Sequence, residues 1–223
     1  MPPFPGWGSS TRCAGISATS RTASTAPAGS ALGRSPAPRR QAWNSRWSIC
    51  PDEDWPFAFQ ARQSFRLGAD GLAVTLSVTN HAAGPAPAGL GLHPFFPRHP
   101  ETRIRFRSTA AWLNDADQLP AEHVARDYSA GCRAAETELD NDFEGWDGMA
   151  EILQPDGLTI RLTADAPLRW LRAFTPAQWN VVALEPVSHG ANALNRDDPA
   201  ALGIVTLLPG GTLSGTIRLS AVS

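Results

Sequence analysis

The stretch Leu72-Ala-Val-Thr-Leu-Ser-Val78 decides the fold class, because apolar and polar residues alternate along it. A period of two is the pattern of a β-strand that buries one face. Similar short stretches recur along the chain, at Arg62–Leu67, Arg103–Arg107, Leu158–Thr163, Leu168–Phe174, Asn180–Leu184 and Thr212–Leu219. Turn sequences lie between several of them, and no long amphipathic helix pattern is present. The sequence therefore predicts an all-β fold, a large antiparallel β-sandwich.

The bulk composition excludes several classes of function. With 223 residues, of which 42% are hydrophobic, the chain can bury a sizeable core. A net charge of −2 argues against a nucleic-acid partner. No stretch is apolar enough for a membrane span or a secretory signal, so we expect a cytoplasmic protein with no membrane partner. The sequence contains no lysine, and its three cysteines have no metal-site spacing, so we expect neither a cofactor nor a bound metal.

Residues 1–50 differ in character from residues 51–223. They contain no Asp or Glu, are rich in Ser, Thr, Ala, Pro, Gly and Arg, and show no helical or strand period. All 21 acidic residues lie in residues 51–223. We therefore expect an atypical, disordered segment over 1–50 and the β-sandwich domain over 51–223.

Three local sequences contain candidate functional residues. They are Gly89-Leu-Gly-Leu-His-Pro-Phe-Phe-Pro97, Leu139-Asp-Asn-Asp-Phe143 and Leu184-Glu-Pro-Val-Ser-His189. His93 closes an apolar run, where a histidine often has only a structural role, and Asp140 could belong to an Asx turn. Glu185 is more unusual, since it follows an apolar run at a predicted strand end. A carboxylate there is partly buried and needs partners.

These residue types suit general acid–base catalysis on a sugar. Opening a hemiacetal ring needs a base for the proton of the C1 hydroxyl and an acid for the ring oxygen. A histidine and a carboxylate facing each other across a polar groove suffice, without metal or cofactor. Phe95, Trp112 and Trp146 could stack on the sugar ring, or could equally be core residues.

The three sequences, in this order, resemble the bacterial branch of the aldose 1-epimerase (galactose mutarotase-like) family. The resemblance implies an isomerase that interconverts the α and β anomers of a hexose without a cofactor. It implies that His93 is the general acid, Glu185 the general base, and Asp140 a substrate-binding residue. It also implies the large β-sandwich of that family. It makes no prediction of the oligomeric state.

Two other functions remain open. A hexose-6-phosphate 1-epimerase would need clustered arginines for the phosphate, and Arg98, Arg103 and Arg105 are close in sequence. A carbohydrate-binding module without turnover is the other alternative, because N-terminal motifs of the family, Asn-Arg and His-Gly-x-Gly-Trp, are absent from residues 1–50.

The missing motif suggests that residues 1–50 are read out of frame. If each codon of Thr25–Gly33 began one base earlier, the degenerate code would permit His-Gly-x-Gly-Trp-Gln-Arg-x-Trp. Sequencing the gene tests this hypothesis. We expect a contiguous His-Gly-x-Gly-Trp in the alternative frame, and its absence would show that the leader is unrelated.

Overall fold

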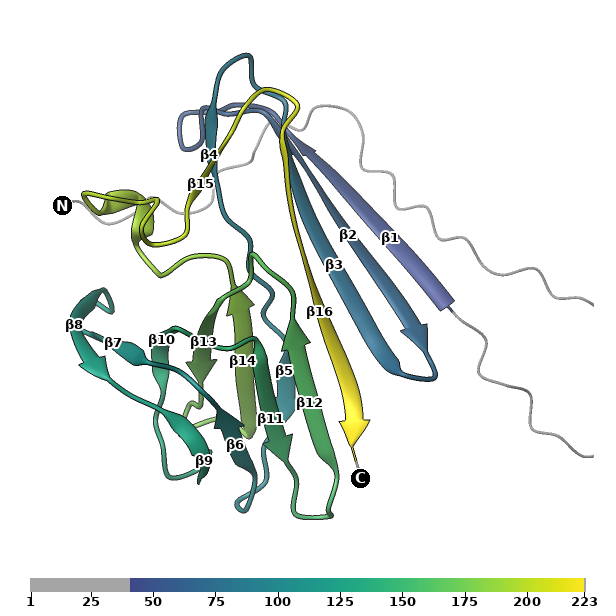
Figure 1. Ribbon diagram of the computed structural model, residues 1–223, viewed down its shortest axis with the longest axis vertical. Helices are drawn as coiled ribbons and strands as arrows, with labels where there is room; N and C mark the ends of the chain where they lie inside the picture. Colours follow the sequence, from purple (N-terminus) through teal and green to yellow (C-terminus); the bar gives the residue numbers. More distant parts are fainter. Residues whose placement is uncertain (1–40, 223) are drawn as a thin grey trace, which may run out of the picture.

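The computed structural model describes residues 41–222, which form two packed antiparallel sheets and a small third one (Figure 1). Across these residues there is no α-helix, and the one helical turn is the 3₁₀ segment η1 (Ala193–Asn195). The strands are β1 (Gln41–Ile49), β2 (Phe59–Gly68), β3 (Gly71–Asn80), β4 (Ala86–Ala88), β5 (Phe95–Pro97), β6 (Arg103–Phe106), β7 (Ala110–Asn114), β8 (Pro120–Ala125), β9 (Tyr128–Arg133), β10 (Asp140–Glu144), β11 (Met149–Leu153), β12 (Thr159–Ala164), β13 (Trp170–Phe174), β14 (Val181–Val187), β15 (Val205–Leu207) and β16 (Thr212–Val222). The predicted all-β antiparallel sandwich is confirmed.

The larger sheet has the order β1-β2-β3-β16-β12-β11-β6-β9 among the described residues. The stretch Leu72–Val78 lies in β3, paired with β2 and with the C-terminal strand β16. The β2–β3 hairpin needs glycine at Gly71, whose φ is +116°. A Cβ there would meet the carbonyl oxygen of Leu219 at 2.0 Å, so only glycine allows the hairpin to lie against β16.

The smaller sheet has the order β5-β14-β13-β10-β7-β8 in the described part of the chain. Its central strands β14, β13 and β10 contain the predicted apolar runs and the Asp140 sequence. Asp140 therefore lies in a strand and not in an Asx turn.

The core lies between the two sheets, because each strand turns its apolar alternate residues inward. Completely buried side chains from both sheets form one cluster. From the larger sheet they are Ile104, Ile152, Leu162 and Ile217, and from the smaller sheet Phe143, Leu171, Val182 and Leu184.

The smaller sheet covers only part of the larger one. Strands β1, β2 and β3 project beyond it, as the purple and blue arrows of Figure 1 show. Trp43 and Trp47 of β1 and Leu67 of β2 are accordingly exposed. On this part of the larger sheet, large apolar side chains face solvent instead of a second layer of described residues.

The larger sheet also crosses the expected boundary after residue 50. Strand β1 pairs with β2 through all nine of its residues. Its alternation was missed because Ser45 stands between Trp43 and Trp47 on their face of the strand. Residues 1–40, including the Thr25–Gly33 stretch of the frame hypothesis, lie outside the described residues. Among residues 41–222, no helix is both long and apolar enough to span a membrane.

The position of the core predicts the effect of truncating a buried leucine. Leu162 of β12 is 0% exposed, whereas Leu208 is 66% exposed. Leu162→Ala should lower the free energy of unfolding by about 3 kcal/mol, because it removes buried methyl groups and leaves a cavity. Leu208→Ala should change it by less than about 0.5 kcal/mol. Urea unfolding measures both, and equal effects would contradict this packing.

Candidate active site

One face of the smaller sheet gathers polar and aromatic side chains from five adjacent strands. Antiparallel pairing places five residues in a row across it: Glu185, Arg172, Asp142, Trp112 and His123. Because successive side chains of a strand point to opposite faces, this row lies opposite the apolar cluster. Three of its five residues are ionisable groups at the centre of the sheet, which is unusual for a purely structural surface.

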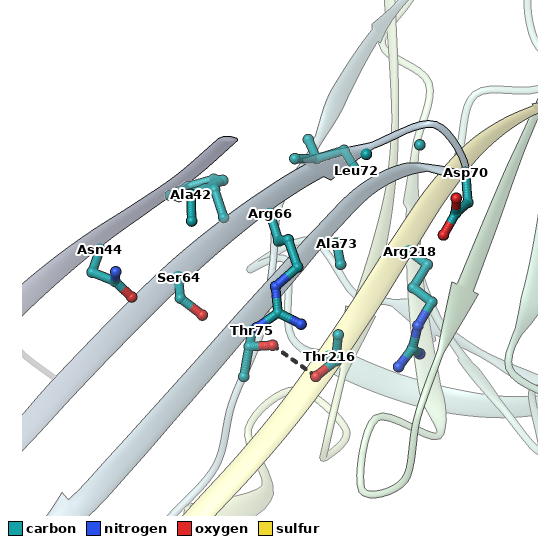
Figure 2. Close-up of a pocket in the computed structure, with 13 residues that line it drawn as sticks. Ala42, Asn44, Ser64, Arg66, Asp70, Leu72, Ala73, Thr75, Thr216 and Arg218 are labelled. Carbon is teal, nitrogen blue, oxygen red and sulfur yellow. Dashed lines mark hydrogen bonds between the residues drawn. The ribbon is translucent and has the colours of Figure 1, made fainter. Parts of the chain in front are cut away.

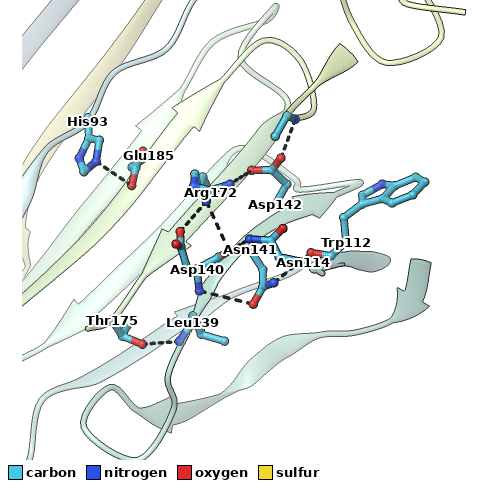
Figure 3. Close-up of polar contacts among 11 residues, drawn as sticks. His93, Trp112, Asn114, Leu139, Asp140, Asn141, Asp142, Arg172, Thr175 and Glu185 are labelled. Atoms are coloured by element: carbon cyan, nitrogen blue, oxygen red, sulfur yellow. Dashed lines mark hydrogen bonds and ion pairs between the residues drawn. The ribbon is translucent and has the colours of Figure 1, made fainter. Parts of the chain in front are cut away.

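His93 meets Glu185 at one end of this row. The segment before β5 runs beside the end of β14, with the Leu90 amide donating to Ser188 Oγ (2.8 Å) and the Leu92 amide to the Pro186 carbonyl (3.1 Å). This places His93 Nε2 3.1 Å from Glu185 Oε1 (Figure 3). The His93 side chain is 50% exposed and that of Glu185 only 7%. The sequence prediction that these two residues face each other therefore agrees with the geometry.

Close packing against His189 explains the glycine at position 89, which begins the segment Gly89–Pro97. A Cβ on Gly89 would meet the His189 ring at 2.4 Å. The chain can pass this close to the end of β14 only because residue 89 has no side chain. Gly89 thus permits the approach that brings His93 to Glu185.

The environment of Glu185 favours its protonated form. Burial raises the pKa of Glu185 from 4.5 to about 7, Arg172 acts in the opposite direction, and Asp140 and Asp142 add to the rise. Glu185 Oε1 accepts no well-aligned hydrogen bond among the described residues. With this pKa the carboxyl can take up or release a proton near neutral pH.

Burial shifts the pKa of His93 the other way. Loss of water around the ring lowers it from 6.5, a hydrogen bond with its own backbone opposes the shift, and Arg172 lowers it further. Burial thus disfavours the charged forms of both groups, and because they lie 3.1 Å apart their titrations are coupled. The two macroscopic pKa values belong to the pair rather than to either residue.

Arg172 joins the two aspartates of the second motif. Its Nη2 donates to Asp140 Oδ1, and its Nη1 donates to Asp142 Oδ1 at 3.1 Å. The other oxygen of Asp142 accepts from the Ala191 amide at 2.6 Å. Figure 3 shows Arg172 between Glu185 and this pair of aspartates. Asp140, the predicted substrate-binding residue, lies beside the acid–base pair with its side chain 43% exposed.

Arg172 was missed by the sequence analysis. The available signal was an arginine in the middle of an otherwise apolar strand, Trp170-Leu-Arg-Ala-Phe174. A charge there needs nearby carboxylates, and β10 supplies them.

The three aromatic candidates have different positions. Phe95 is exposed and stacks on the His93 ring with centroids 4.4 Å apart. Trp112 lies on the same sheet face in the row defined above. Trp146 is buried, and its indole donates to the Met149 carbonyl, so it is a core residue.

The three candidate phosphate-binding arginines do not gather at this site. Arg98 is buried and donates to the carbonyls of Ala134, Ala177 and Trp179. Arg103 and Arg105 lie on β6 of the other sheet, where Arg105 pairs with Glu151. Their donors are used within the fold.

Two hollows of the described residues lie away from His93 and Glu185. A polar one of about 450 Å³ runs along β1, β2, β3 and β16, where Thr75 and Thr216 share a hydrogen bond of 2.9 Å (Figure 2). An apolar one of about 580 Å³ lies near β4 and β15, with Trp55, Phe57 and Phe59 in its wall. Neither contains a histidine–carboxylate pair like that of His93 and Glu185.

Comparison with known proteins identifies the class. A family model described as aldose 1-epimerase matches residues 45–220. The chain belongs to the aldose 1-epimerase family, in agreement with the resemblance of its three motifs.

Individual relatives agree with this assignment. YphB of Escherichia coli K12, described as an uncharacterized protein, is 31% identical over 176 residues, which cover 73% of this chain and 60% of YphB. A candidate aldose 1-epimerase of known structure from E. coli K12 is 27% identical, with a TM-score of 0.74 over 86% of this chain and 67% of that one. A galactose mutarotase-like protein from Clostridium acetobutylicum has the same fold, with 19% identity and a TM-score of 0.73 over 82% of this chain and 63% of that one. The chain thus spans about 60% of the length of its curated relative.

The raised pKa of Glu185 predicts a pH-dependent stability difference. Between pH 4.5 and 7 the unfolded chain ionises this carboxyl while the folded protein keeps it protonated. The folded protein then binds more protons, so its free energy of unfolding falls as the pH rises. Glu185→Gln removes this loss, and the variant should gain stability relative to the parent from pH 5 to pH 8. Urea unfolding at both pH values measures it, and a constant difference would show that the pKa is ordinary.

Proposed function

We propose that this protein is an aldose 1-epimerase that interconverts the α and β anomers of a hexose. The observation that carries the proposal is the buried Glu185 carboxyl, which faces His93 at 3.1 Å and whose pKa is raised to about 7. Asp140 on the same sheet face supplies an acceptor for sugar hydroxyls, and Phe95 an exposed apolar ring.

The proposed reaction starts from the form of the pair in which His93 carries the proton and Glu185 is ionised, the less populated form in the free protein because burial favours the neutral groups. Ionised Glu185 takes the proton of the C1 hydroxyl while protonated His93 gives one to the ring oxygen, and the C1–O5 bond breaks to leave an aldehyde. After rotation about the C1–C2 bond, the 5-hydroxyl attacks the other face of C1 and the two transfers reverse. The C1 hydroxyl and the ring oxygen share one carbon, so an acid and a base in contact can serve both.

The charges around the pair favour a neutral sugar. Asp140 and Asp142 both pair with Arg172, and the next cation found along the row among the described residues, Arg196, lies over the Trp112 ring. A phosphate on the substrate would be repelled here, and Arg98, Arg103 and Arg105 are engaged elsewhere. No observation therefore favours a hexose-6-phosphate over a free hexose.

Polarimetry on fresh α-D-glucose and α-D-galactose tests the proposal. The protein should accelerate mutarotation above the spontaneous rate, and Glu185→Gln should lower the catalysed rate at least ~100-fold, because general acid–base catalysis is typically worth that much. His93→Asn should have a comparable effect, because either change removes one end of the proton exchange.

Glu144→Gln is the matched control. Glu144 also contacts a histidine, His123, at 3.0 Å, but both side chains are about half exposed. This variant should keep the parental rate. A parental rate no faster than the spontaneous one would contradict the proposal. Sugar binding retained under those conditions, with equal affinity in Glu185→Gln, would instead support a binding module without turnover.

A further inference from the structure

Arg172 is the cation that faces the acid–base pair. It is the antiparallel partner of Glu185 on the neighbouring strand and projects from the same sheet face. Its side chain is 25% exposed. The guanidinium therefore lies beside Glu185 in surroundings that screen its charge only weakly.

Two carboxylates, those of Asp140 and Asp142, pair with the guanidinium of Arg172. They differ in burial and in whether their second oxygen already accepts a hydrogen bond. Asp142 is almost fully buried, and its second oxygen is used by the Ala191 amide. Asp140 is 43% exposed, and its second oxygen has no hydrogen bond within residues 41–222. Asp142 is thus the anchor, and Asp140 is the partner with an oxygen free for a ligand.

We propose that Arg172 is a positioning residue with two tasks in the proposed reaction: its charge keeps Glu185 ionisable near neutral pH, and its guanidinium aims Asp140 at the sugar. This inference rests on the proposed mutarotation for its second task only. The first concerns the free protein and can be measured without turnover.

The charges facing Glu185 oppose one another. Arg172 lowers the pKa of Glu185, and Asp140 and Asp142 raise it. His93 also responds to Arg172, which lowers its pKa, and to Asp140, which raises it. His189 feels the charge of Asp142, and Arg196 and His123 lie farther along the same row, beside Trp112. Removal of the cation and removal of the anchoring anion must therefore move the titration of Glu185 in opposite directions.

Carbon-13 NMR titration of the Glu side chains, with Glu185→Gln to assign the signal, measures this directly. Arg172→Gln should raise the pKa of Glu185 by about one unit or more, the size typical of losing an adjacent opposite charge. Asp142→Asn should lower it. Arg172→Lys keeps the charge and should leave the pKa close to the parental value.

Kinetics test the second task. In Arg172→Lys the pH profile of kcat/KM should stay in place while KM rises severalfold, because a lysine cannot make the two-armed contact that aims Asp140. In Arg172→Gln the whole profile should move to higher pH, and in Asp142→Asn to lower pH. A purely structural role would lower activity in all three variants without moving any profile.

Arg161→Gln is the control, since Arg161 pairs with the buried Glu151 on the other sheet. It should change neither the titration of Glu185 nor the pH profile. If Arg172→Gln does not fold, Asp142→Asn still decides, because an unchanged or raised pKa of Glu185 in that variant overturns the proposal. Shifted titrations without any catalysed mutarotation would uphold the electrostatic task and contradict only the proposed function.

Discussion

The burial of the Glu185 carboxyl is the constraint on which the rest of the site depends. A carboxylate in the middle of a sheet loses most of its hydration, and the strand tolerates it only if the group stays protonated or has charged partners nearby. This protein uses both solutions. The pKa of Glu185 is raised to about 7, and Arg172 stands directly opposite on the next strand. Arg172 in turn needs carboxylates, which β10 supplies from Asp140 and Asp142. The charged row across the smaller sheet follows from this single buried group.

Much of the fold could be predicted because one physical pattern governs it. Strands β3, β12 and β16 bury one face and leave the other polar, so their sequences alternate visibly. Strand β1 was missed because neither face is covered and Ser45 interrupts its apolar side. Short strands such as β4, β5 and β15 have three residues each, too few for any period. For the candidate site, the motifs predicted His93, Glu185 and Asp140, which the structure places near one another, but Arg172 depends on a cross-strand register that local sequence does not contain.

Part of the larger sheet has no second layer among the described residues. Strands β1, β2 and β3 turn Trp43, Trp47 and Leu67 to solvent, although side chains of this size stabilise a sheet mainly when a second layer buries them. Among the described residues, the inner face of the smaller sheet packs on the core and its outer face carries the charged row, while strands β1, β2 and β3 of the larger sheet have no covering layer.

The charged face of the smaller sheet and the uncovered strands β1–β3 are separate parts of the molecule. His93, Glu185, Arg172 and both aspartates belong to the smaller sheet or to the segment beside it, and the inward residues of the same strands are completely buried. In the proposed reaction, a rigid support of this kind would hold the acid, the base and a hydrogen-bond acceptor in fixed positions before a substrate arrives, which would lower the cost of ordering them. The exposed strands β1–β3 contribute none of these groups. The electrostatics of the pair therefore depend on groups that the smaller sheet and the segment beside it supply.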